Sequence, residues 1–398
     1  MSGPLAGLKV LDLSTVIAGP FAAALLGDFG AEVLKVELPG GGDPLRAMPP
    51  HKDGKPLLWK AVNRNKRAVT LDVRKPQGRA ILERLLPRFE VLIENFRPGT
   101  LDRWGLGREA LWALQPKLVI LRVTGFGQTG PYRSYTGFAR LFEAYGGLTY
   151  INGEPGRAPL HPGYPIGDPI SGAFGALGIL VALLHRARHP EAPGQEIDLS
   201  CTEAVMRLLD VLPIEYDQLG LVHEPPGGGN VYVAPSGVFR SADGRWVTFA
   251  AATQSIFERF CAVIGRPELA QDERYATNPA RMAHAAELNA LVADWIGARP
   301  LAEGVRLLAE GGIAAAPIYS NREIAADPHF RARGAITRAA DEDFGSVAVP
   351  GVVPRLSGTP GEVRASGPAA GAHNAEVYGQ WLALSEAEQA ALRSARVI

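Results

Sequence analysis

The fold of this chain is decided by residues 8–38, LKVLDLSTVIAGPFAAALLGDFGAEVLKVEL. Its two ends, 8–13 and 32–38, are short runs rich in Val and Leu, which are typical of buried β-strands. The Ala-rich segment between them starts with Gly-Pro at 19–20, as many helices do. A strand, a helix and a second strand in about thirty residues form a βαβ unit with parallel strands.

The same alternation continues along the chain. Further strands are predicted at 67–73, 90–96, 117–123 and 196–199, and helices at 77–86, 100–114, 137–147 and 169–188, with another helix ending at 209. Strands separated by helices predict an α/β fold with a mainly parallel sheet. In such a sheet, ligands bind beyond the carboxyl ends of the strands.

The length of 398 residues exceeds the usual size of a single core. The clearest change in composition is EPPGGGN at 224–230. We therefore expect a large domain over 1–223, completed by 330–398, and a smaller α/β domain over 224–329. The smaller domain should begin with a hairpin at 237–249, turning at Asp243-Gly244. The tail from Asp341 is rich in Gly, Pro and Val and ends in a short helix at 385–393.

Charge and composition exclude several classes of protein. The 41 basic residues balance 41 acidic ones without blocks of like charge, which argues against nucleic acid or a membrane surface as the main partner. The longest apolar run, 173–184, is too short to span a bilayer, and the amino terminus lacks a leader pattern, so a cytoplasmic protein is expected. The two cysteines form no CxxC pair and HExxH is absent, so neither a disulfide framework nor a metal site is expected.

Three sequence features bear on cofactors. The turn after the first strand, STVIAGP at 14–20, lacks GxGxxG, so a nicotinamide or flavin cofactor is not expected. The glycine clusters 40–43 (GGGD) and 227–229 (GGG) are typical either of flexible loops or of a lid or main-chain cradle. Basic residues at 63–67, with Lys35, Arg74, Lys75 and Arg97, either face solvent or form a phosphate pocket.

One carboxylate, Asp168, lies in GYPIGDPISG at 163–172, between a turn-rich loop and an apolar run. Asp before Pro169 predicts an N-cap followed by the first helical residue. The same helix terminus would keep the carboxylate ionised, and a carboxylate is nucleophilic enough to attack a thioester. No GxSxG elbow competes with it, and of the eight histidines only His161 is kept as a candidate.

Five ordered blocks carry a family resemblance: LAGLKVLDL at 5–13, GDFGAEVLKVE at 27–37, NKR at 65–67, ENFRPG at 94–99 and GFGQTGP at 125–131. With these blocks the chain resembles the class III CoA transferases, which include formyl-CoA:oxalate and carnitine CoA transferases, with α-methylacyl-CoA racemase as a relative. The resemblance implies a Rossmann-like parallel-sheet large domain, a smaller α/β domain and an interlocked, ring-shaped homodimer.

The resemblance also implies roles for individual residues. Asp168 matches the nucleophile, which forms an aspartyl anhydride and then an aspartyl-CoA thioester. Gly227, Gly228 and Gly229 match a lid, and Arg46, Arg140 and Tyr145 are candidates for holding the acceptor carboxylate. The positions that match CoA contacts are Ile17, Ala18, Leu71, Arg74, Asn95, Phe96, Arg97, Arg103, Thr136, Gly137, Phe138 and Ala139.

Two departures narrow the expected reaction. Racemases of this kind have a second acid/base histidine where this chain has Phe138, which disfavours proton exchange. The formyl-CoA enzymes have Gln, Arg and Tyr where Ile17, Leu38 and Phe138 stand here, which disfavours oxalate as the acceptor. We expect a CoA transferase that uses an acyl-CoA donor, such as succinyl-CoA, and a small organic or dicarboxylic acid. The alternatives are a racemase and a non-catalytic CoA-binding protein.

Overall fold

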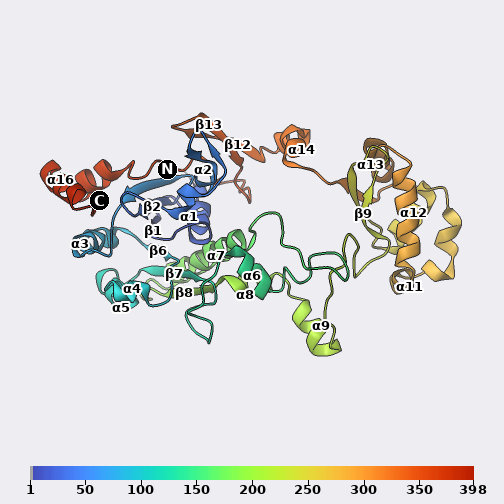
Figure 1. The fold of residues 1–398 in the computed structure, drawn as a ribbon, viewed down its shortest axis with the longest axis horizontal. Coiled ribbons are helices and arrows are strands. Elements are labelled where there is room, and N and C mark those ends of the chain that lie inside the picture. The colour runs from blue at the N-terminus through green and yellow to red at the C-terminus, as the bar shows by residue number, and fades with distance from the viewer. Residues whose placement is uncertain (1–2) are drawn as a thin grey trace. The chain divides into compact units, whose positions relative to one another are not determined.

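The computed structural model describes residues 3–398, which fold as two compact units (Figure 1). The first unit comprises the chain up to Thr149, His161–Leu221 and His329–Ile398, and the second comprises Tyr150–Leu160 and Val222–Pro328. The main boundaries lie within two residues of the predicted ones. The assignment of 150–160 to the large domain is wrong, because Tyr150 donates to Glu224 (2.7 Å) and Gly227 N–H donates to Gly153 O (2.9 Å).

The first unit is built on a parallel six-stranded sheet in the order β5-β2-β1-β6-β7-β8. Its strands are β1 (Lys9–Asp12), β2 (Glu32–Glu37), β5 (Lys66–Thr70), β6 (Val91–Glu94), β7 (Val119–Thr124) and β8 (Glu196–Ser200). The predicted α/β fold with a parallel sheet is confirmed. Successive strands run outward in opposite directions from β1 and β6, so the carboxyl ends of these two neighbours flank the crevice where ligands bind in such sheets.

Helices cover both faces of this sheet. One face carries α1 (Ala18–Asp28), α6 (Ala139–Tyr145), α7 (Gly167–Arg188) and α8 (Cys201–Arg207). The other carries α3 (Pro76–Leu85), η2 (Leu86–Arg88), α4 (Thr100–Arg103), α5 (Arg108–Leu114), η5 (Ala375–Trp381) and α16 (Glu386–Ser394). The single helix predicted at 100–114 is two helices, because the chain turns through Gly105 with a φ of 75°.

The packing of α1 against α7 depends on glycine. A Cβ at Gly172 would lie 2.6 Å from Ala18 O and 2.9 Å from Cδ1 of Phe21. Since α7 has 22 residues and is apolar enough to cross a membrane by length and composition, the expectation of a run too short to do so is wrong. Its inward face, including Ala176 and Ile179, is instead part of the core.

Several elements were not predicted from the sequence: η1 (Pro44–Ala47), β3 (His51–Lys52), β4 (Lys55–Pro56), α2 (Leu57–Val62), α9 (Leu212–Leu219), β12 (Ile336–Asp341) and β13 (Gly345–Pro350). The tail from Asp341 is therefore more regular than expected, since β12 and β13 form an antiparallel pair. Lys60 holds this hairpin through ion pairs to Asp341 (3.0 Å) and Asp343 (2.7 Å). These contacts join segments almost 300 residues apart, so local sequence patterns do not reveal them.

The second unit is a small α/β structure. Its antiparallel sheet has the order β11-β10-β9, with bounds β9 (Ser236–Arg240), β10 (Trp246–Ala250) and β11 (Ala314–Pro317). Its helices are α10 (Gln254–Val263), η3 (Pro267–Gln271), η4 (Glu273–Tyr275), α11 (Asn278–Ala283), α12 (Ala285–Gly297), α13 (Leu301–Glu310) and α14 (Asn321–Ala326), and α15 (Pro328–Ala332) follows at the boundary. The predicted hairpin with its turn at Asp243-Gly244 is confirmed.

Candidate active site

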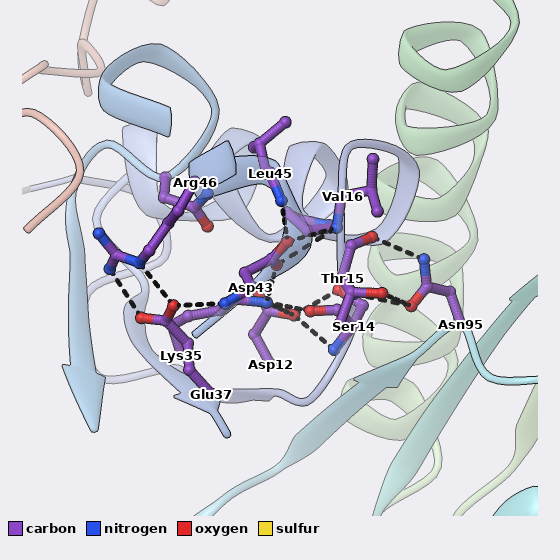
Figure 2. A network of polar contacts seen from close by, with 12 residues as sticks. Asp12, Ser14, Thr15, Val16, Lys35, Glu37, Asp43, Leu45, Arg46 and Asn95 are labelled. Atoms are coloured by element: carbon purple, nitrogen blue, oxygen red, sulfur yellow. Dashed lines mark hydrogen bonds and ion pairs between the residues drawn. The ribbon is translucent and has the colours of Figure 1, made fainter. Parts of the chain in front are cut away.

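The turns that follow β1 and β6 are tied together at the centre of the sheet edge. Thr15 N–H donates to Oδ1 of Asn95 (2.7 Å), and Nδ2 of Asn95 donates to Thr15 O (2.8 Å), as Figure 2 shows. One amide side chain thus holds the two turns together. The geometry fixes the crevice at the point where the strand order reverses.

A cavity of about 230 Å³ opens beside these turns. Asp168 from α7 is part of its wall, and the turn before α1, the end of β7 and the starts of α6 and α8 supply most of the rest. The lining residues are Thr15, Val16, Ile17, Ala18, Asn95, Val123, Thr124, Gly125, Gly137, Phe138, Phe142, Asp168 and Cys201. A single half-buried carboxylate among mainly apolar and backbone groups is the arrangement expected of a reactive acid.

Asp168 is not the N-cap that its sequence predicts. The helix α7 begins at Gly167, so Asp168 is its second residue, and the capping position falls on Ile166. The hydrogen bond from Ile170 N to Ile166 O (3.0 Å) closes the first turn earlier than the Asp-Pro pair indicated. Gly167 permits this start because a Cβ there would lie 3.0 Å from Ala139 O.

The charge on Asp168 also differs from the expectation. Burial, and secondly the negative charge of Glu143, raise the pKa of Asp168 to about 7. A helix N-terminus contributes only about 0.3–1 kcal/mol to holding a negative charge. The expectation that the helix keeps this carboxylate fully ionised is therefore wrong, because desolvation outweighs the helix dipole.

Glu143, on α6, is a site residue that the sequence reasoning missed. Its side chain is fully buried and accepts from Gly167 N–H (3.1 Å) and from Nη1 of Arg140 (3.0 Å). Nδ1 of His161 lies 3.5 Å from the same carboxylate. Glu143 therefore reaches the residue next to Asp168, and the one available signal was its i,i+3 spacing from Arg140.

Arg140, a candidate for holding the acceptor, is already engaged. Besides Glu143, its Nη1 donates to Pro162 O (2.6 Å) and fastens the loop that leads to α7. Arg46 binds Glu37 through Nε and Nη2 (2.7 and 2.8 Å). Tyr145 is 55% exposed and packs edge-on against Phe126. The residues lining the Asp168 cavity do not include these three candidates.

A second cavity, of about 220 Å³, adjoins the same turn, and Thr15 lines both. Its wall is mainly apolar. The lining residues are Leu13, Thr15, Val36, Glu37, Leu38, Gly42, Asp43, Pro44, Leu71, Val73, Arg74, Phe96 and Trp104. Phe96 and Trp104 pack edge to face with ring centres 5.0 Å apart, which leaves aromatic surface for a flat ligand.

The predicted CoA positions divide among these cavities. Five of them line the Asp168 cavity, namely Ile17, Ala18, Asn95, Gly137 and Phe138. Three line the apolar cavity, namely Leu71, Arg74 and Phe96. Four line neither, namely Arg97, Arg103, Thr136 and Ala139. Among these four, Arg97 donates to Oγ1 of Thr136 (2.7 Å), which joins the loops after β6 and β7.

The three lid glycines belong to the second unit. Gly227 N–H donates to Gly153 O (2.9 Å), and Gly228 O accepts from Val238 N–H (2.9 Å) on β9. Gly227 has a φ of 62°, which suits glycine. These contacts describe the loop within its own unit, and its role as a lid stays a prediction.

The sheet order and the half-buried Asp168 define an α/β protein with a cavity at the strand-order reversal, where sheets of this kind bind their ligands. The model of CoA-transferase family III matches residues 5–374. The chain is 45% identical to succinyl-CoA–D-citramalate CoA-transferase of Chloroflexus aurantiacus, over 99% of this chain and 98% of that one. It is 42% identical to the alpha subunit of succinyl-CoA–L-malate CoA-transferase from the same organism, over 99% and 92% of the two chains.

Solved structures of this family share the fold of the chain. A CAIB/BAIF family protein from Brucella suis superposes with a TM-score of 0.84 at 32% identity, covering 96% of this chain and all of that one. The chain belongs to CoA-transferase family III. It is therefore an enzyme of the CoA-transferase class, as the sequence predicts.

Proposed function

We propose that this enzyme moves CoA from succinyl-CoA to a small dicarboxylic acid, with Asp168 as the nucleophile. The observation that carries the proposal is the half-buried Asp168 carboxylate in a cavity shared with five predicted CoA positions. The names of the relatives, which match along nearly the whole chain, support succinyl-CoA as donor. They also favour an acceptor of the size of malate, citramalate or glutarate.

In this proposal one acyl-CoA occupies both cavities. The thioester lies beside Asp168, and the nucleotide end lies in the apolar cavity against Leu71, Phe96 and Trp104. Aromatic and aliphatic side chains suit the flat adenine base. Arg74, on the wall of the second cavity, suits a phosphate, and its Nε donates to Oδ1 of Asp72 (2.7 Å).

The reaction proceeds by four acyl transfers. The Asp168 carboxylate attacks the thioester carbonyl, the C–S bond breaks, and CoA thiolate leaves a mixed anhydride. The thiolate attacks the Asp168 carbonyl, which releases succinate and forms an aspartyl-CoA thioester. The acceptor carboxylate attacks this thioester and expels the thiolate again. The thiolate then attacks the acceptor carbonyl, which gives the new acyl-CoA and restores Asp168.

The environment of Asp168 suits this chemistry. A carboxylate with a pKa near 7 is more basic than one in water and therefore a better nucleophile, while a useful fraction stays ionised at neutral pH. Val16, Val123 and Phe142 exclude water from part of the cavity wall. Exclusion of water protects the anhydride, whose hydrolysis would waste the thioester.

The functional form we propose is the homodimer, interlocked as in the resembling enzymes. The outer face of α7 carries an exposed stripe spaced i, i+3, i+4 and i+7, made of Leu177, Leu180, Val181 and Leu184. The helix α9 has no buried residue in the described chain, and its Ile214 and Leu219 are 62% and 74% exposed. An exposed apolar surface of this extent is typical of a subunit interface.

The decisive experiment traps the intermediates. Protein incubated with succinyl-CoA and then with hydroxylamine should carry a hydroxamate on the peptide that contains Asp168, detected by mass spectrometry. Asp168→Asn should abolish both the label and the transfer, while Asp198→Asn, a carboxylate outside the cavity, should retain the label. An unlabelled wild-type protein, or label on another peptide, would remove the nucleophile assignment.

A panel of acceptors identifies the second substrate. Succinyl-CoA is offered with D-citramalate, L-malate, glutarate and oxalate, and each new thioester is measured by mass spectrometry. We expect the four- and five-carbon dicarboxylates to react and oxalate to fail. Exchange of the α-proton of an acyl-CoA for deuterium without any acceptor would instead support a racemase.

A further inference from the structure

The glycine loop 40–43 ends in a buried acid that the reaction does not use. Asp43 is 2% exposed, and its Oδ1 accepts from Leu45 N–H (2.8 Å) and Val16 N–H (3.0 Å). Oδ2 lies 3.2 Å from Val16 N and 3.1 Å from Nζ of Lys35. Figure 2 shows this carboxylate between Lys35 and the turn that precedes α1.

The turn needs such a restraint. Val16 has a φ of 66°, in the left-handed region that a β-branched residue rarely adopts. A conformation of this kind is strained and persists only where surrounding contacts impose it. Asp43 holds Val16 from one side, and Asn95 holds Thr15 from the other.

The position of Asp43 is itself fixed. Its N–H donates to Oε2 of Glu37 (2.9 Å), and Glu37 is held by the two-bond pair with Arg46. Gly42 has a φ of 66°, and a Cβ there would lie 2.9 Å from Cδ of Arg46. The GGGD loop is thus held in a defined conformation by these contacts and is not only a flexible connection.

We propose that Asp43 is a positioning residue that holds the two cavities in the relative position that a single acyl-CoA needs to occupy both. This inference rests on the proposed function. Asp43 lines the apolar cavity, and the residue it binds, Val16, lines the Asp168 cavity. Binding of the nucleotide end is therefore coupled through this turn to the placement of the thioester.

The test compares two donors. Succinyl-pantetheine lacks the nucleotide and so does not use the apolar cavity. Asp43→Asn removes the charge and half of the accepting capacity of the side chain. We expect kcat/KM with succinyl-CoA to fall by about tenfold to a hundredfold, because a misplacement of about 1 Å costs up to about a hundredfold. With succinyl-pantetheine the fall should be much smaller. The donor ratio, which is kcat/KM with succinyl-CoA divided by kcat/KM with succinyl-pantetheine, should therefore decrease. An equal fall with both donors, or no fall, would overturn the proposal.

Asp28→Asn is the matched control, since Asp28 is equally buried, is paired with Nε of Arg64 (3.0 Å), and lines neither cavity. It should lower the melting temperature and leave the donor ratio unchanged. If Asp43→Asn does not fold, Gly42→Ala displaces the same loop without stranding a charge, because Gly42 has a φ of 66° and a Cβ there would lie 2.9 Å from Cδ of Arg46. It should lower the ratio more than Gly41→Ala, where a Cβ has open space. Equal ratios in these two variants would also overturn the proposal. A wild-type enzyme that transfers nothing from succinyl-CoA would refute the proposed function instead.

Discussion

The carboxylate of Asp168 is half-buried and lies near a second acid, Glu143, which is fully buried. Burial and Glu143 raise its pKa from 3.8 to about 7. Glu143 reaches Asp168 through the folding of α6 against the start of α7, by its bond to Gly167 N–H. At the scale of single residues, the pKa of Asp168 is set first by its burial in the fold and secondly by Glu143, and not by the sequence around Asp168.

The first prediction concerns the pH dependence of the reaction. Only ionised Asp168 attacks the thioester, so kcat/KM for succinyl-CoA should rise with pH and level off above about 7. Glu143→Gln keeps an oxygen for Gly167 N–H but removes the repulsion, and the rising limb should move to lower pH. The control is Glu90→Gln, which breaks an ion pair with Arg186 (3.0 Å) outside the cavity. If the rising limb of the pH profile does not move in Glu143→Gln, the negative charge of Glu143 does not contribute to the raised pKa of Asp168.

The second prediction concerns stability. Between pH 3.8 and about 7, folded Asp168 binds a proton that the unfolded chain has released, so the free energy of unfolding decreases as pH rises through this window. Above pH 7 the folded protein buries a charge. Asp168→Asn removes that cost and should raise the free energy of unfolding at pH 8 on the order of a few kcal/mol. Denaturant unfolding at pH 5 and 8 checks this, and a gain that is not larger at pH 8 would contradict it.

At the scale of elements, the contact between α1 and α7 places the acid beside the turn. Gly172 lies one turn after Asp168, and its backbone lies close to Ala18, which lines the cavity. Small side chains on both helices, such as Ala22 and Ala176, allow this approach. The distance between nucleophile and turn is therefore set by side-chain volume on two helices.

The third prediction follows from this contact. Gly172→Ala introduces a Cβ 2.6 Å from Ala18 O, so the helices must separate, which should cost about 1–3 kcal/mol of stability and lower kcat. Thermal unfolding and turnover with succinyl-CoA measure the two effects. Gly163→Ala, where a Cβ has open space, is the control and should change neither. Unchanged stability in Gly172→Ala would show that the packing tolerates the methyl group.

At the scale of the whole molecule, we expect the exposed apolar stripe on α7 to be buried against another surface. The fourth prediction is that the protein is a dimer in solution and that Leu180→Glu with Leu184→Glu shifts it towards the monomer, measured by analytical ultracentrifugation. Leu114→Glu changes a comparably exposed leucine on α5 and should leave the dimer intact. Binding of the wild-type protein to lipid vesicles would instead indicate that a membrane, and not a second subunit, buries the stripe.

The sequence predicted the sheet well because its strands are short, apolar and locally encoded. The prediction was weaker where distant segments meet. The hairpin of β12 and β13 depends on Lys60, and residues 150–160 join the second unit through Glu224. The Arg candidates illustrate the same limit, since Arg46 and Arg140 are bound to Glu37 and Glu143 in the fold.

By itself, the sequence determined the α/β alternation, the family blocks and the importance of Asp168, because each depends on residues close together in the chain. Only the tertiary structure decided the start of α7 at Gly167, the raised pKa of Asp168 and the link from Asp43 to Val16. These properties depend on burial, on charges that act through space and on backbone contacts between elements. A linear pattern does not contain those distances.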